Sequence, residues 1–202
     1  MEAGLHTELE LSTLFHSLVP PEQLMQRGRP ASIVPDCLTR VALPPADQRR
    51  DARPGRVQPA LRLLFDVKTI HAGTADYACR RAVEDQAGAV ATRAARVGGE
   101  YLAHARRLDA RFHGADTPIA DRLRSFGDVR ALVFGQYGEA SRDVHFLLSA
   151  AAESAAAREW RQAGARTREE YRAHALATIR RRIGLVAVRA HARHRLDRVP
   201  FI

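Results

Sequence analysis

The spacing of apolar residues predicts two helices in the first 140 residues. One spans residues 5–18, and a longer one spans residues 81–112, where the pair Gly98-Gly99 marks a possible kink. The apolar positions are Leu11, Leu14, Phe15 and Leu18 in the first helix, and Val83, Val90, Ala94, Val97, Tyr101, Ala105, Leu108 and Phe112 in the second. Each helix is therefore expected to turn one side to a hydrophobic core.

Three further segments have the character of strands. The segment "ASIVPDCLTRVAL", residues 31–43, is apolar and β-branched around a Pro-Asp pair, which predicts two short strands or one interrupted strand. The segments "ALRLLFDVKTI", residues 60–70, and "VRALVFGQ", residues 129–136, are apolar runs of strand length. Residues 44–59 are rich in Pro, Arg and Asp and are expected to form an exposed loop.

The C-terminal third has helical character throughout. Residues 141–164 and 167–196 predict two helices, the second broken only by Gly184. The second keeps one face apolar through Tyr171, Ala175, Ile179, Ile183, Val186 and Ala190. The fold class predicted by this order is α/β: a central mixed sheet of about four strands flanked by helices, formed by residues 1–140, with a helical C-terminal extension, residues 141–202, packed on it.

Composition places this chain among globular proteins of a reducing compartment. Its 202 residues are 46% hydrophobic, without an apolar run long enough to cross a bilayer, and the start of the chain is acidic rather than basic. Cys37 and Cys79 are too few for a disulfide framework or a zinc cage. We therefore expect no membrane association and an intracellular location, nuclear in a eukaryote and cytoplasmic otherwise.

The charge of the chain indicates a polyanionic partner. The formal net charge is +9, and basic proteins of this kind most often bind nucleic acid, although an arginine-biased composition alone also raises the charge. On the predicted helix 81–112, Arg93, Arg96, Arg107 and Arg111 fall together beside the apolar face. Of these, Arg93, Arg96 and Arg107 are candidate contacts to DNA phosphates, and a solvated helix face is the competing interpretation.

One residue departs from the arginine bias. Lys and Arg total 32, and Lys68 is the only lysine, which leaves 31 arginines. A residue needed only for charge could have been arginine, whereas chemistry that requires a compact ammonium able to give up a proton could not. Asp66 lies two positions earlier, so in a strand the two side chains share one face. A solvent-facing ion pair on an edge strand is the alternative explanation.

The pair Pro35-Asp36, followed 30 residues later by Asp66-Val67-Lys68, resembles the signature of the PD-(D/E)XK nuclease superfamily. The resemblance covers roughly residues 5–140 as a succession of elements. It implies a restriction-endonuclease-like fold and an endonuclease that hydrolyses DNA phosphodiester bonds. The style of the sequence also resembles reading frames of mobile genetic elements, in which such a domain would be part of a larger polyprotein.

Hydrolysis of a phosphodiester explains why these residue types are needed. Negative charge develops on the attacking water, the nonbridging oxygens and the leaving oxygen, and Mg²⁺ or Mn²⁺ stabilises it. Such cations prefer oxygen ligands, which Asp36, Asp66 and the backbone carbonyl of Val67 would supply. Lys68 would orient or deprotonate the attacking water, which an arginine could not do.

Three further residues are weaker candidates. The first helix of this superfamily often supplies another acidic residue, and Glu8 or Glu10 would fill that role. His71, just past the strand of Lys68, is a candidate contact to nucleic acid, and a surface or capping histidine is the plainer interpretation.

Two classes of function stay open at this level. The first is a metal-dependent endonuclease, for which a homodimer would supply two active sites, one for each strand. The second is a non-catalytic basic module that binds nucleic acid or partner helices, including an inactive nuclease that keeps the fold. The positions of Asp36, Asp66 and Lys68 in space bear on the choice between them.

Overall fold

A computed structural model describes residues 6–9, 14–21, 25–26, 29–30, 34–41, 61–70, 86–135 and 138–196. The predicted loop 44–59 lies outside this set. The chain divides into two compact units, Leu5–Val144 and a second that contains His145–Ile202. The sequence predicts a division after residue 140, whereas this one falls after Val144, within a helix. Whether the C-terminal helices pack on the sheet stays a prediction, and the two units are considered separately below.

The first unit is built on a mixed four-stranded sheet with the order β1-β4-β5-β6. Its strands are β1 (His6–Leu9), β4 (Cys37–Val41), β5 (Leu61–Ile70) and β6 (Arg130–Gly135), and a separate two-stranded sheet joins β2 (Met25–Gln26) to β3 (Arg29–Pro30). The pairs β1–β4 and β4–β5 are antiparallel, and β5–β6 is parallel. The prediction of an α/β class with a central mixed sheet is therefore confirmed.

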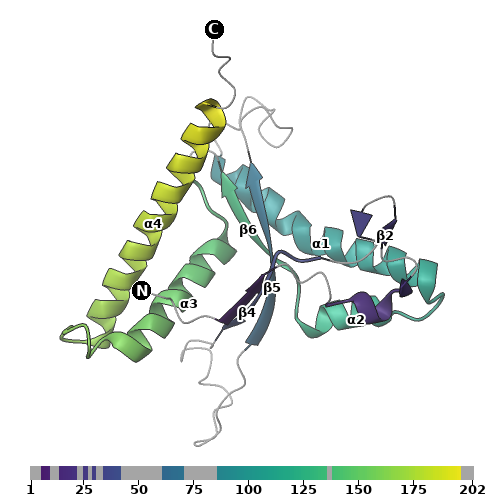
Figure 1. Cartoon of the computed structure of the whole chain (residues 1–202), viewed down its shortest axis with the longest axis horizontal. Coiled ribbons are helices and arrows are strands. Elements are labelled where there is room, and N and C mark those ends of the chain that lie inside the picture. Colours follow the sequence, from purple (N-terminus) through teal and green to yellow (C-terminus); the bar gives the residue numbers. More distant parts are fainter. Residues whose placement is uncertain are drawn as a thin grey trace, which may run out of the picture. The chain divides into compact units, whose positions relative to one another are not determined.

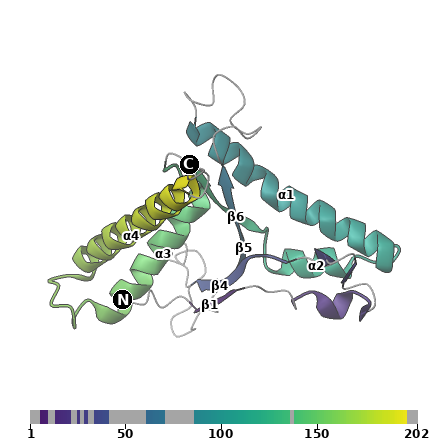
Figure 2. The ribbon, with the colours of Figure 1, turned by 45° about the horizontal axis from the view of Figure 1, so that its top comes forward.

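The parallel pair β5–β6 requires a crossover, which α1 (Gln86–Phe112) and α2 (Pro118–Ser125) provide. Figures 1 and 2 show α1 starting beside β6 and running obliquely to the strands. Apolar residues of α1 pack with β5 and β6 in one core, which includes Leu64, Ile70, Val90, Val97, Ala105, Leu108, Ala131 and Val133. The predicted apolar face of the long helix is thus the face that covers the sheet.

The helix α1 continues through Gly98-Gly99 without a break. A Cβ atom at Gly98 would lie 3.4 Å from the carbonyl oxygen of Val129, the residue before β6. Gly98 therefore allows the helix to approach the backbone closely, and the Gly98-Gly99 pair does not split the helix.

The predicted helix at residues 5–18 is wrong. His6–Leu9 forms strand β1, in which Glu8 pairs with Leu38 of β4, and His16–Leu18 is a single turn of 3₁₀ helix. Phe15 is fully buried in the core. Pairing with a strand some thirty residues away outweighs the local helical spacing, because propensity is a weak preference that tertiary contacts override.

The short helix α2, which apolar spacing did not reveal, depends on a buried aspartate of α1. The Asp109 carboxylate, 1% exposed, accepts hydrogen bonds from the backbone N–H groups of Ile119 and Ala120, both at 2.9 Å. These are orphan donors of the first turn of α2, and Thr117 at the N-cap position makes no capping bond to them. Asp109 thus caps a helix other than its own.

We expect Asp109→Ala to lower the free energy of unfolding by about 3 kcal/mol, because it leaves two buried N–H groups without an acceptor. Chemical denaturation followed by circular dichroism measures this loss. Asp121→Ala is the matched control: Asp121 is exposed in the first turn of α2, and its carboxylate has two surface partners, Arg124 and the hydroxyl of Thr117. It should cost less than about 1 kcal/mol. Equal losses in both variants would contradict the capping role.

The second unit consists mainly of α3 (Arg142–Glu159), which begins in the first unit, and α4 (Arg168–Leu196). Ala152, Ala155 and Ala156 of α3 pack against Tyr171 and Ala175 of α4. The small alanine side chains allow the two helices to lie close together. Among the described residues, we find no helix that combines the length and the apolar character needed to span a membrane.

Candidate active site

Asp66 is a buried carboxylate in the middle of β5. Its strand is paired on both sides, with β4 and β6, and Asp66 is 1% exposed. On the same strand face, Leu64 and Ile70 belong to the core beneath α1. A carboxylate in such a place is costly unless other groups compensate it, so its partners define the site.

Lys68 is the first partner of Asp66. Its Nζ donates a hydrogen bond to Oδ1 of Asp66 at 2.9 Å and lies 2.8 Å from Oδ2, and the Lys68 side chain is 38% exposed. As the spacing predicts, the two side chains share one face of the strand. The ammonium thus lies against both carboxylate oxygens, and Oδ2 has it as an ionic neighbour but has no hydrogen bond from any described residue. Asp66 therefore keeps a buried oxygen with unused acceptor capacity.

Tyr101 of α1 is the second partner. Its hydroxyl donates to Oδ1 of Asp66 at 2.8 Å and lies 3.3 Å from the carbonyl oxygen of Val34. A hydroxyl has one proton, so the shorter bond to the charged oxygen dominates. Burial and, next, the hydrogen bond to Asp66 raise the pKa of Tyr101 well above its usual range. The tyrosine is thus a permanent donor that holds the carboxylate of Asp66 in one orientation.

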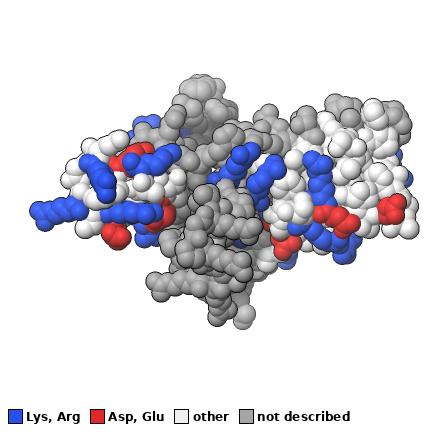
Figure 3. Space-filling model, turned by 90° about the horizontal axis from the view of Figure 1, so that it is seen from below, with Lys and Arg blue, Asp and Glu red and all other residues white. Residues whose placement is uncertain are grey.

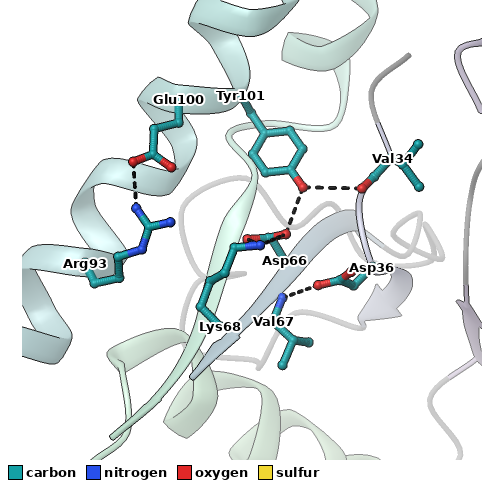
Figure 4. A network of polar contacts seen from close by, with 8 residues as sticks. All are labelled: Val34, Asp36, Asp66, Val67, Lys68, Arg93, Glu100 and Tyr101. Atoms are coloured by element: carbon teal, nitrogen blue, oxygen red, sulfur yellow. Dashed lines mark hydrogen bonds and ion pairs between the residues drawn. The ribbon is translucent and has the colours of Figure 1, made fainter. Parts of the chain in front are cut away.

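Asp36 reaches the same strand from a distant part of the sequence. Its Oδ2 accepts a hydrogen bond of 2.6 Å from the backbone N–H of Val67, the residue between Asp66 and Lys68. Asp36 is exposed, whereas Pro35 before it is buried. Figure 4 shows Asp36 and Asp66 on either side of the backbone of β5, with Lys68 and Tyr101 around Asp66. One carboxylate is thus accessible and the other is enclosed.

Cys37 begins β4 directly after Asp36. It is a free, buried cysteine, and burial together with the charge of Asp36 raises the pKa of its thiol. It therefore stays a neutral thiol, which is a poor metal ligand.

The arginines of α1 differ in what they contact. Arg93 forms an ion pair at 2.6 Å with Glu100, the residue before Tyr101, as Figure 4 shows. Arg96 and Arg107 are exposed and make no ion pair with any residue in the described ranges. Arg93 would have to leave Glu100 to bind a phosphate, so Arg96 and Arg107 are the better candidates of the three.

The oxygen atoms at this place match the preference of a hard divalent cation. Asp36 contacts the backbone N–H of Val67, the residue after Asp66, so the candidate oxygen ligands are the two carboxylates and the Val67 carbonyl, and one oxygen of Asp66 lacks a hydrogen bond. No cluster of three or more His, Cys, Asp or Glu side chains suited to a metal occurs among the described residues. A cation here would thus rely on two carboxylates, the backbone and water.

Other predicted site residues cannot be placed. Glu8 lies in β1, but its side chain is outside the described part of the structure, as are Glu10 and His71. Tyr101 is the converse case, because sequence reasoning assigned it to the apolar face of its helix and gave it no role at the site. Its hydroxyl group in an otherwise apolar stripe could have indicated a polar partner in the core, since a buried tyrosine needs one.

Tyr101→Phe should destabilise the protein by about 2 kcal/mol at pH 8, where the hydrogen bond to the charged Asp66 is lost. The raised pKa predicts how this difference changes with pH. Above pH 10 the unfolded tyrosine ionises while the folded one stays protonated, so the stability that the raised pKa contributes is lost as the pH rises. The wild type should therefore lose stability faster than the variant. Urea unfolding at pH 8 and pH 11 tests this. If the difference in free energy of unfolding between the wild type and Tyr101→Phe is as large at pH 11 as at pH 8, the prediction is contradicted.

A scan against protein-family models, a search of curated proteins and a search of solved structures each found no match to this chain.

Proposed function

We propose that this protein is a metal-dependent endonuclease that hydrolyses DNA phosphodiester bonds, with a core of the restriction-endonuclease-like type. The observation that carries the proposal is a pair of contacts at β5. Lys68 donates a hydrogen bond to Asp66, and Asp36, 30 residues before Asp66 in the chain, accepts one from the backbone N–H of Val67 between them. The succession of strands, the Asp-x-Lys strand, a long helix and a parallel strand supports the same reading.

The chemistry assigns a separate task to each side chain. Asp36 and Asp66, with the Val67 carbonyl, would hold a Mg²⁺ or Mn²⁺ ion, which when bound supplies positive charge to the reacting phosphate. Lys68 has its ammonium beside Asp66 and is partly exposed, so as an ammonium it can orient a water molecule in front of the site. To act as the base it would first have to release one of its own protons to solvent, and the neutral amine could then accept the proton of that water. Tyr101 keeps Asp66 in place throughout.

DNA is the substrate that the charge of the protein favours. The formal net charge is +9, and basic side chains predominate over acidic ones on the face drawn in Figure 3. Arg96 and Arg107 lie about three turns apart on α1, the helix that also carries Tyr101, so they are available to hold phosphates on either side of the one that is cut. Cutting both strands at one place would take two copies of the protein.

Incubation with supercoiled plasmid tests this function. The wild type should nick the plasmid with Mg²⁺ or Mn²⁺ and leave it intact with a chelator. Asp36→Asn should remove most of the activity while its amide oxygen still accepts the hydrogen bond from Val67. Asp116→Asn, at an exposed turn, is the matched control and should cut normally.

A wild type that binds plasmid and never cuts it with either metal would overturn the proposal. It would favour the non-catalytic module or an inactive nuclease instead. Equal rates of plasmid cleavage by the wild type and Asp36→Asn would likewise contradict the proposal, because they would show that Asp36 is not needed for hydrolysis.

A further inference from the structure

The helix α4 is much longer than its neighbour. It has 29 residues, against 18 in α3. Its first part is fixed: Arg168 and Arg172 both pair with Glu153 of α3, and the hydroxyl of Tyr171 donates to Glu159 at 2.8 Å. Packing against α3 reaches as far as Ile179. The first part of α4 is thus packed against α3, whereas the contacts with α3 do not explain the length of its second half.

Four residues in that second half form one exposed face, which we term the distal face: Arg182, Leu185, Val186 and Arg189. Positions i, i+3, i+4 and i+7 of a helix lie on the same side. Leu185 is 50% and Val186 65% exposed, two of the three large exposed hydrophobic residues in the described part of the chain. Both arginines are exposed as well. An apolar pair therefore lies between two arginines.

The charge around this face has a single sign. Between Tyr171 and Leu196 the sequence contains seven arginines and no acidic residue. The distal arginines make no ion pair with any residue in the described ranges, whereas Arg168 and Arg172 at the base do. Such a surface attracts phosphates, and arginine binds them with paired donors.

We propose that the distal face of α4 binds duplex DNA, with Arg182 and Arg189 on phosphates of the two backbones that border a groove. Seven residues of helix separate the two arginines by about 10.5 Å along the axis. That distance is close to the major groove width of about 12 Å. Leu185 and Val186, between them, would face the groove, where thymine methyl groups offer apolar contacts.

The composition of this part of the helix favours DNA over a lipid surface. Helices that lie in a membrane interface usually carry Trp, Phe or many Leu residues on their apolar side. From Arg172 to Leu196 the sequence has no Phe, Tyr or Trp. Among the described side chains of that segment, Leu185 and Val186 are the only large apolar ones that are well exposed. Two aliphatic residues supply little area for membrane binding, but they suffice to fill the space between two phosphate contacts.

This surface is independent of the Asp66 site, so its test does not require cleavage. Binding of a fluorescent DNA duplex is measured in chelator at several salt concentrations, for the wild type and for Arg182→Gln/Arg189→Gln. Loss of two phosphate contacts should weaken binding and reduce the slope of log K against log salt concentration by about 1.8. Circular dichroism confirms that the variant is folded.

Arg161→Gln/Arg166→Gln removes the same charge at the exposed turn between α3 and α4, and it should keep the wild-type slope. An unchanged slope in the distal variant would overturn the proposal, as would an equal reduction in the control, since net charge alone would then explain the binding. Wild-type binding to vesicles of anionic lipid that depends on Leu185 and Val186, without binding to the duplex, would overturn it in favour of a membrane surface.

Discussion

Lys68→Arg is expected to lower the rate of DNA cleavage by about 10²- to 10⁴-fold, the usual contribution of a positioned proton-transfer group. The substitution keeps the positive charge beside Asp66, so it should preserve both the ion pair and the affinity for DNA. What it removes is a group able to give up its proton, because a guanidinium stays charged at accessible pH. The prediction thus separates chemistry from charge at the only lysine of the chain.

Single-turnover cleavage of plasmid in Mn²⁺ measures this effect, with duplex binding in chelator measured alongside. Arg62→Lys is the matched control, since it makes the converse exchange on the same strand, at an exposed residue that lies over the ring of Phe126. It should leave the rate unchanged. Cleavage by Lys68→Arg at the wild-type rate would show that position 68 supplies charge alone.

Asp66→Asn is expected to abolish both cleavage and the stabilisation of the fold by divalent metal. A cation at 100 times its dissociation constant stabilises the wild type by about 2.7 kcal/mol, which thermal unfolding detects as a rise in Tm. The variant should show no such rise. In chelator the variant should lose about 1–3 kcal/mol of stability, because the asparagine oxygen can still accept from Tyr101, whereas its buried amide NH₂ group lies beside the Lys68 ammonium without an acceptor.

Asp143→Asn provides the comparison for this experiment. Asp143 forms a similar ion pair with Arg130 at 3.1 Å, away from Asp66, so the variant loses an ion pair and keeps the proposed metal ligands. It should retain the full metal-dependent rise in Tm. A rise in Asp66→Asn equal to that of the wild type would place the metal elsewhere.

The elements that sequence patterns predicted correctly are those whose patterns are long. β5 is a strand of ten residues in which apolar side chains predominate, and α1 keeps one face apolar over 27 residues. Such patterns persist over enough positions to identify the secondary structure and the buried side. The C-terminal helices were predicted for the same reason.

The errors arise where distant residues decide the structure. β1 forms because it pairs with β4, and α2 is capped by a residue of α1 ten positions before it. Neither partner can be deduced from the local pattern of apolar residues.

In the candidate site, too, local contacts were predicted and distant ones were not. Asp66 and Lys68 meet because two positions on one strand share a face, which spacing alone predicts. The approach of Asp36 to Val67 joins residues 31 positions apart and was expected only from a resemblance. The contact of Tyr101 with Asp66, over 35 positions, depends on how α1 packs on the sheet. Arg93 was predicted to be available to DNA, but Glu100, two turns along the same helix, holds it.

The proposed endonuclease function depends most on a single cation shared by Asp36 and Asp66. Anomalous diffraction from crystals of the wild type soaked in Mn²⁺ tests it directly. We predict a peak with a carboxylate oxygen of each residue at about 2.0–2.3 Å. A peak bound by other residues, or no peak at Mn²⁺ concentrations that raise the Tm, would contradict the claim.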